Sequence, residues 1–206
     1  MKDRLFSCFI GVTLGVLGMI SGGCVTGTTA PSRFYVLSAM PDPSEQMRVL
    51  TENRCLAIGI GPVEVAQYLD RPQIVTRVGP NELKLGEYDK WAEPLKDTVT
   101  RVLAENLSNL LCTDPIAVFP WRGAARVDYR VEVEVLLLDG KLGGEASLAA
   151  RWAIFHEERR LMLLNGKSHI NEPTDGQDYK AFVSAQSRAL GALSKEIAEG
   201  IQTVLQ

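Results

Sequence analysis

The sequence Val-Asp-Tyr-Arg-Val-Glu-Val-Glu-Val-Leu-Leu at residues 127–137 decides the fold of this chain. Its odd-numbered positions are apolar or aromatic, whereas positions 128, 130, 132 and 134 are charged. Successive side chains of a β-strand point to opposite faces of a sheet, so this alternation predicts a strand with one face in the core. The other face, which carries Arg130, Glu132 and Glu134, is expected to meet solvent or a partner.

More strands are expected on both sides of this stretch. A glycine-rich turn at residues 139–144 leads to a return strand at residues 146–155. Residues 161–164 and 167–170 flank Asn165-Gly166, the preferred dipeptide of a two-residue hairpin turn, and therefore predict a second hairpin. Shorter strand signals, including a hairpin around Gly79, Pro80 and Asn81, lie upstream at residues 34–37, 55–65, 74–78, 82–85 and 116–119.

Two segments have the spacing of amphipathic helices. Apolar residues recur at intervals of three and four over residues 91–111 and 179–205, which places them on one face of each helix. Runs of antiparallel strands combined with two helices predict an α+β fold, in which a mixed, mainly antiparallel sheet carries both long helices on one face. We expect residues 33–206 to form a single domain of this kind.

The N-terminal residues are typical of an export signal. Lys2 and Arg4 precede an uncharged apolar run at residues 5–20, which predicts a secretory signal peptide over residues 1–23. The sequence Ser21-Gly22-Gly23-Cys24 that follows resembles the lipobox of bacterial lipoproteins, although Ser21 stands where that motif usually has leucine. The resemblance implies that Cys24 is lipidated and begins the mature chain. The alternative is plain secretion, with Cys24 as an unmodified thiol.

The residues after Cys24 bear on where the chain is anchored. Residues 24–32 contain mainly threonine, glycine, alanine, serine and proline, and predict a short flexible tether between the lipid and the fold. Val25 follows the cysteine, rather than the aspartate that resembles an inner-membrane retention signal. The sequence therefore favours an anchor in the outer membrane.

The amino-acid composition argues against some classes of function, such as nucleic-acid binding and metal binding. The chain has 206 residues, is 46% hydrophobic and has a net charge of −3. These values fit a globular protein and argue against a nucleic-acid partner, because such proteins usually present a basic face. Two histidines and four cysteines leave little for a metal site. Export would place Cys55 and Cys112 in an oxidising compartment, so they are candidates for a disulfide, with two buried free thiols as the alternative.

The familiar catalytic motifs are absent from the sequence. The run His156-Glu157-Glu158-Arg159-Arg160 lacks the second histidine of the zinc-protease motif and is typical of a charged turn. Gly59-Ile60-Gly61 lacks the third glycine of a dinucleotide-binding loop, and no Gly-x-Ser-x-Gly, Cys-x-x-Cys or Walker sequence occurs. We therefore predict a protein that is not an enzyme, with no catalytic residues, no metal and no cofactor.

Two segments are the best candidates for contacts with a partner. Tyr68-Leu69-Asp70-Arg71-Pro72-Gln73 mixes aromatic, apolar and charged residues; tyrosine and arginine are favoured at interface hot spots, and proline stiffens a loop. The alternative is structural, with Asp70 and Arg71 or Arg77 in local ion pairs while Tyr68 and Leu69 pack. Trp121, which follows Pro120, is the best candidate for an exposed aromatic side chain.

Eight stretches of the mature chain form an ordered set, in which Tyr-Leu-Asp-Arg-Pro-Gln-Ile-Val-Thr-Arg at residues 68–77 is the most distinctive. The others lie at residues 34–37, 59–63, 91–95, 120–121, 128–131, 150–152 and 185–190. In this order and spacing they resemble the PqiC family, the ABC-type transport auxiliary lipoproteins. The resemblance implies an outer-membrane lipoprotein that faces the periplasm and accompanies an MCE-domain protein, a class that bridges the two membranes and is linked to lipid traffic and envelope integrity.

The resemblance makes docking of the MCE partner at the outer membrane our leading hypothesis. Partners shaped as rings or tubes favour cyclic assembly of the subunits that dock them, so we also expect a homo-oligomer. Two alternatives stay open: a periplasmic domain that carries a lipid in an apolar cavity, and a lipoprotein that activates a cell-wall enzyme.

Overall fold

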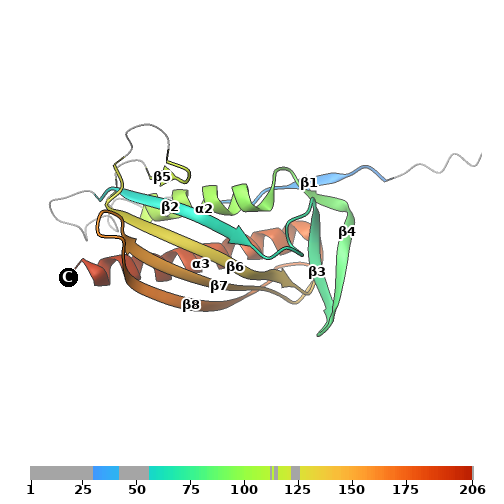
Figure 1. Ribbon diagram of the computed structural model, residues 1–206. Coiled ribbons are helices and arrows are strands. Elements are labelled where there is room, and N and C mark those ends of the chain that lie inside the picture. The colour runs from blue at the N-terminus through green and yellow to red at the C-terminus, as the bar shows by residue number, and fades with distance from the viewer. Residues whose placement is uncertain (1–29, 42–55, 112, 114–115, 122–125, 206) are drawn as a thin grey trace, which may run out of the picture. The chain divides into compact units, whose positions relative to one another are not determined.

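The computed structural model describes residues 30–41, 56–111, 113, 116–121 and 126–205, and all elements below belong to the unit Ser32–Gln206. Within these ranges the chain combines strands with two helices, which confirms the α+β class (Figure 1). The elements in chain order are β1 (Arg33–Tyr35), β2 (Ile58–Val65), β3 (Gln73–Gly79), β4 (Glu82–Trp91), α2 (Leu95–Leu110), β5 (Ala117–Val118), β6 (Tyr129–Gly140), β7 (Glu145–His156), β8 (Leu161–Pro173) and α3 (Tyr179–Val204).

The strands form two sheets. The larger sheet has the order β5-β2-β6-β7-β8, in which β2 runs parallel to both neighbours and β6, β7 and β8 are antiparallel. The smaller sheet has the order β1-β4-β3 and consists of the β3–β4 hairpin with β1 added in parallel to β4. The predicted hairpin at Gly79, Pro80 and Asn81 is confirmed, but its strands pair with β1 instead of joining the larger sheet.

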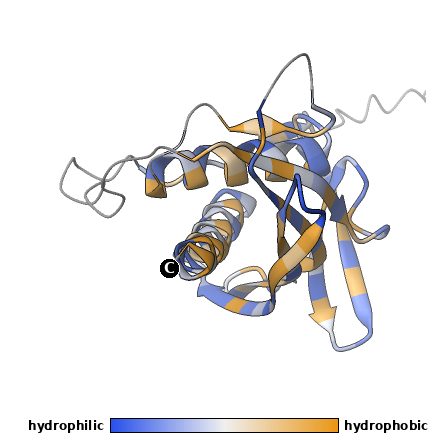
Figure 2. Ribbon diagram, turned by 60° about the vertical axis from the view of Figure 1, so that its left-hand side comes forward, coloured by the Kyte–Doolittle hydropathy of each residue, from blue (hydrophilic) through white to orange (hydrophobic). Residues whose placement is uncertain are grey.

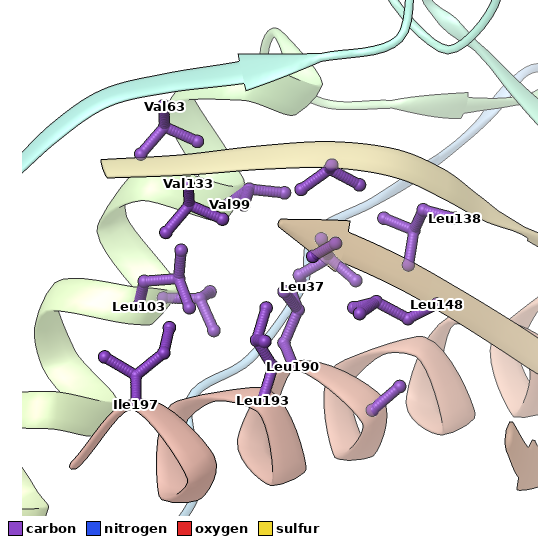
Figure 3. Packing of buried hydrophobic residues seen from close by; sticks show 14 of the residues in the cluster. Leu37, Val63, Val99, Leu103, Val133, Leu138, Leu148, Leu190, Leu193 and Ile197 are labelled. Carbon is purple, nitrogen blue, oxygen red and sulfur yellow. The ribbon is translucent and has the colours of Figure 1, made fainter. Parts of the chain in front are cut away.

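Both helices cover one face of the larger sheet, as predicted (Figures 1 and 2). α3 lies against β7 and β8, and α2 packs between β2 and α3. Figure 3 shows side chains from the helices, the strands and the segment after β1 meeting in one core, among them Leu37, Val63, Val99, Leu103, Val133, Leu138, Leu148, Leu190, Leu193 and Ile197. None of the described helices has the length and apolarity needed to cross a membrane.

The final helix begins at the residue that the sequence predicts. Asp178 precedes it, and its side chain accepts a hydrogen bond from the Ala181 N–H at 2.8 Å. Such a cap satisfies one of the four N–H groups that a helix leaves free at its start. The inward face of α3 includes Ala185, Ala189 and Ile197, each 0% exposed, so the predicted apolar stripe is core.

The alternating strand is β6, and its alternation stops at a bulge. Val131, Val133 and Val135 are buried as predicted, but the pairing with β7 shifts between Val135 and Leu137. A bulge adds one residue to a strand and reverses the facing of the residues beyond it. Leu138 is therefore the next core residue, and Asp139, which the sequence placed in a turn, lies within the strand on the opposite face.

The prediction that a helix starts at Trp91 was wrong, because Trp91 ends β4. The Trp91 N–H donates to the Pro72 carbonyl at 2.7 Å, and the Ala92 N–H donates to the Tyr35 carbonyl at 2.9 Å. Proline disfavours helical backbone in the residue before it, so α2 starts only after Pro94. The apolar spacing continues across Trp91 because both the strand end and the helix face the same core.

The prediction of a hairpin around Asn165-Gly166 was also wrong, because β8 runs without a break from Leu161 to Pro173. Gly166 pairs with Trp152 of β7, and a Cβ atom at Gly166 would lie 2.4 Å from Cζ2 of the Trp152 ring. The same ring approaches Gly200 of α3, where a Cβ would lie 3.0 Å from Cη2. Glycine at position 166 thus makes room for a tryptophan between the sheet and the helix and does not form a turn.

We predict that Gly166→Ala lowers the free energy of unfolding by about 1–3 kcal/mol, the usual cost of overpacking a well-filled core. Urea denaturation followed by circular dichroism measures the change. Gly79→Ala is the matched control, since its Cβ would meet nothing closer than 3.9 Å. Equal losses in the two variants would contradict this account of Trp152.

Candidate docking surface

A buried carboxylate fastens the β3–β4 hairpin to the larger sheet. Asp139 of β6 is 1% exposed and accepts hydrogen bonds from Arg77 Nε at 2.9 Å and from Arg77 Nη2 at 2.6 Å. The Tyr68 hydroxyl donates to the same carboxylate at 2.9 Å. A planar guanidinium bound by both carboxylate oxygens is a strong and directional contact. One side chain therefore joins β6, β3 and the loop that precedes β3.

The charges in this cluster determine the state of the tyrosine. Burial raises the pKa of Tyr68 above its ordinary value, and the negative charge of Asp139 raises this pKa further. The phenol consequently stays protonated and keeps donating its hydrogen bond to Asp139.

A second buried carboxylate fastens β1 to β4. Asp89 is 5% exposed and accepts hydrogen bonds from Arg33 Nη2 at 2.9 Å and from the Tyr35 hydroxyl at 2.7 Å. Burial raises the pKa of Tyr35 to about 12, with the hydrogen bond to Asp89 as the next cause. The two clusters have the same composition, one aspartate with one arginine and one tyrosine, and each attaches an edge of the smaller sheet.

Some residues of the segment from Tyr68 to Gln73 pack inside the domain, and others are exposed on its surface. Leu69 is 1% exposed and belongs to the core, and Tyr68 is held by Asp139. Asp70 and Pro72 are exposed, so they are the residues of this segment that a partner can reach most easily. The alternative pairing of Asp70 with Arg77 was wrong, since Arg77 pairs with Asp139. A partner contact by this segment stays a prediction.

Trp121 is half-buried and packs on glycine. A Cβ at Gly59 would lie 2.5 Å from Cη2 of Trp121, and a Cβ at Gly61 would lie 2.7 Å from Cβ of Phe119. The rings of Phe119 and Trp121 meet edge to face with their centroids 5.5 Å apart. The aromatic pair can pack this closely on β2 because the two glycines have no side chains. Phe119, which the sequence analysis did not single out, is 48% exposed.

A groove lies beside the aromatic pair, between β2, β5 and the outer side of α2. Its volume is about 680 Å³, and Val63, Ala104, Ile116 and Val118 are among its apolar lining residues. Charged residues of α2 form its rim, where Lys96 Nζ contacts Glu64 Oε1 on β2 at 2.9 Å. Apolar pockets with a few polar groups are the usual form of binding sites.

The charged face of β6 continues across the larger sheet. Glu64, Glu134, Arg151 and Lys167 are successive cross-strand neighbours on β2, β6, β7 and β8. The row therefore runs from acidic to basic, and its central contact joins Arg151 Nη1 to Glu134 Oε2 at 3.3 Å. Exposed pairs of this kind stabilise a fold by about 0–1 kcal/mol. This face can therefore meet solvent or a partner, as the alternation of β6 indicates.

Within the described ranges no three His, Cys, Asp or Glu side chains gather as metal ligands. Cys24, Cys55 and Cys112 lie outside the described residues, so the lipid attachment and the disulfide stay predictions.

Comparison with known families decides the identity. A family model described as the ABC-type transport auxiliary lipoprotein component matches residues 35–198. The chain belongs to this family. The auxiliary lipoprotein also has structural relatives. A Xanthomonas campestris protein of known crystal structure shares 17% sequence identity and a TM-score of 0.69, over 84% of this chain and 96% of the relative.

A second relative supports the same fold. This uncharacterised protein of known crystal structure shares 20% identity and a TM-score of 0.65, over 84% of the auxiliary lipoprotein and 99% of the relative. No curated protein matches the chain. The family's description is that of a transport component and not of an enzyme.

We predict that Asp139→Asn, which keeps the shape of the side chain but removes its charge, lowers the free energy of unfolding by about 2–4 kcal/mol. The loss arises because Arg77 keeps its charge without its buried counter-ion. Urea denaturation measures it. Glu134→Gln, which breaks the exposed pair with Arg151, is the control and should cost about 0–1 kcal/mol. If Glu134→Gln lowered the free energy of unfolding as much as Asp139→Asn does, the Asp139 cluster would not be the contact that links the two sheets.

A second prediction concerns alkaline pH. The folded pKa of Tyr35 is about 12, above the ordinary tyrosine value of about 10. The folded state therefore binds the phenolic proton more tightly, and this contribution to stability is complete below pH ~10 and is lost as the pH rises towards ~12. Tyr35→Phe should flatten the fall in unfolding free energy across this interval in urea titrations at fixed pH values. If Tyr35→Phe left the dependence of the unfolding free energy on pH unchanged, protonated Tyr35 would not contribute to stability in this way.

Proposed function

We propose that this auxiliary lipoprotein is anchored to the outer membrane through Cys24, faces the periplasm, and docks the MCE-domain partner of its transport system there. The observation that carries the proposal is the match of residues 35–198 to the auxiliary-lipoprotein family. The absence of the familiar catalytic motifs from the sequence fits a protein that binds and does not catalyse.

The attachment of β1 is suited to an anchored protein. Residues 24–32 could span at most about 30 Å as an extended chain, so a lipid at Cys24 would keep the domain close to the membrane surface. Any pull from that anchor would reach the domain through β1. The cluster of Asp89, Arg33 and Tyr35 holds this strand to β4 by charged hydrogen bonds as well as by parallel pairing.

The surface near β1 also favours contacts with other subunits. Phe34 of β1 is 64% exposed, and Val36, which lies two residues further along the chain, is 47% exposed. Apolar residues that gather on a surface often mark interaction sites. We propose that this end of the domain takes part in a cyclic homo-oligomer, the arrangement that a tube-shaped partner would favour.

The core argues for docking over lipid carriage. A carrier would need a cavity between the helices and the sheet, whereas the described side chains in that space pack as one cluster (Figure 3). The groove beside β5 lies instead on the outer side of α2.

The anchor is tested by metabolic labelling with a palmitate analogue and by membrane fractionation. Cys24→Ser should abolish the label and release the protein from outer-membrane fractions. Cys8→Ser, which changes a cysteine inside the predicted signal peptide, is the matched control and should leave both unchanged. Full labelling of Cys24→Ser would rule out this anchor.

The docking role is tested by affinity purification of the intact lipoprotein from mildly solubilised envelopes, with mass spectrometry of proteins and lipids. We expect an MCE-domain protein without stoichiometric lipid. Stoichiometric lipid with no MCE-domain protein would overturn docking in favour of lipid carriage. A cell-wall enzyme in its place would favour the activator hypothesis.

A further inference from the structure

Among the described residues, the outer edge of β2 is paired over only part of its length. β5 pairs with β2 at Gly59 and Ile60, and the Phe119 N–H donates to the Ile60 carbonyl at 2.9 Å. From Val63 to Val65, β2 has β6 on one side and no described strand on the other. An unpaired strand edge presents free N–H and C=O groups, which makes it a template for another extended chain.

β5 shows which kind of chain fits this edge. It is a two-residue strand, Ala117–Val118, that runs parallel to β2 and lies against its first half (Figure 1). Its Val118 and the following Phe119 line the groove and remain 44% and 48% exposed. The protein thus already places one short extended segment on the edge, and the groove continues beside the unpaired half.

Apolar side chains form much of the groove lining. Ile60 and Val63 of β2 are 1% and 3% exposed and form part of its lining, together with Ala104 of α2. Alternate side chains of an extended chain point to the same side. A peptide paired with β2 would therefore direct every second side chain towards the groove, where apolar groups would cover Val118.

The rim carries an acidic group that has no ion-pair partner among the described residues. Lys96 is paired with Glu64, and Arg101 Nη2 lies 3.1 Å from Glu93 Oε1. Asp97, on the same helix and also lining the groove, forms no ion pair with any residue in the described part of the chain. A ligand with a basic side chain at this point would satisfy it.

We propose that the groove between β2, β5 and α2 binds an extended polypeptide segment by adding it as a strand to the free edge of β2. Apolar side chains at alternate positions of the segment enter the groove, and a lysine or arginine pairs with Asp97. This mode of recognition takes affinity from backbone hydrogen bonds and specificity from pockets for alternate side chains. The inference rests on the groove itself and does not depend on the MCE partner proposed above.

The free edge distinguishes a peptide from a lipid as the occupant. An acyl chain could cover the apolar lining, but it would leave the N–H and C=O groups of Val63 and Val65 without partners. The acidic side chain of Asp97 also disfavours the phosphate of a lipid headgroup, because like charges repel.

The experiment selects random dodecapeptides displayed on phage against the intact lipoprotein in detergent micelles. We expect enriched peptides with alternating apolar residues and a lysine or arginine, without proline at the pairing positions. Labelled synthetic copies should slow amide hydrogen exchange in Val63–Val65.

Two variants with matched controls locate the binding. Val118→Asp should weaken peptide binding at least tenfold, and Val78→Asp, an exposed valine of β3 outside the groove, should not. Asp97→Lys should weaken binding several-fold, and Glu158→Lys, an exposed acidic residue in the turn after β7, should not. Circular dichroism of each variant confirms that the fold is retained.

Other outcomes would overturn the proposal. No enrichment, or binding that survives Val118→Asp in a folded variant, would remove the groove as the site. Fluorescent parinaric acid that binds the wild type and not Val118→Asp would make the groove a lipid site. Self-association that Val118→Asp abolishes would make it an interface between copies of this chain.

Discussion

The ion pair between Arg77 and Asp139 sets the relation between the two sheets. A buried carboxylate is costly unless a charged partner and further hydrogen bonds satisfy it. Asp139 is almost fully buried, so β3 must bring Arg77 to it and the preceding loop must bring Tyr68. The bulge in β6 makes this arrangement possible, because it turns Asp139 away from the core face that Leu138 occupies. The hairpin is thus packed against the larger sheet and does not extend it.

Two close contacts between a tryptophan ring and a glycine determine the local packing at two places on the larger sheet. Trp121 lies on Gly59 of β2, and Trp152 lies on Gly166 of β8. The first contact packs the segment after β5 against β2, next to the groove. The second fills the space between β7, β8 and α3. In both places a glycine pattern resembled a familiar local motif, but its cause was a ring from a distant part of the chain.

The chain belongs to a family of transport auxiliary lipoproteins, and its described part presents two separate surfaces where contacts can form. At one of these surfaces Asp89 holds β1 to β4, and apolar residues such as Phe34 are exposed. The groove along β2 is a separate surface, on the outer side of α2. Under the proposals above, one surface would contact copies of the same chain and the other would bind an extended peptide.

The sequence by itself determined the α+β class, the alternating strand β6, the start of the final helix, and the family, because each depends on local periodicity or on an ordered set of residues. Only the tertiary structure decided that the strands form two sheets, that Asp139 is the partner of Arg77, and that Gly166 lies within a strand. The candidate segment 68–73 was found from its residue types, but its division into buried Leu69 and exposed Asp70 was not. These decisions depend on contacts between residues far apart in the chain, such as the 62 positions that separate Arg77 from Asp139, and local pattern carries no information about such distances.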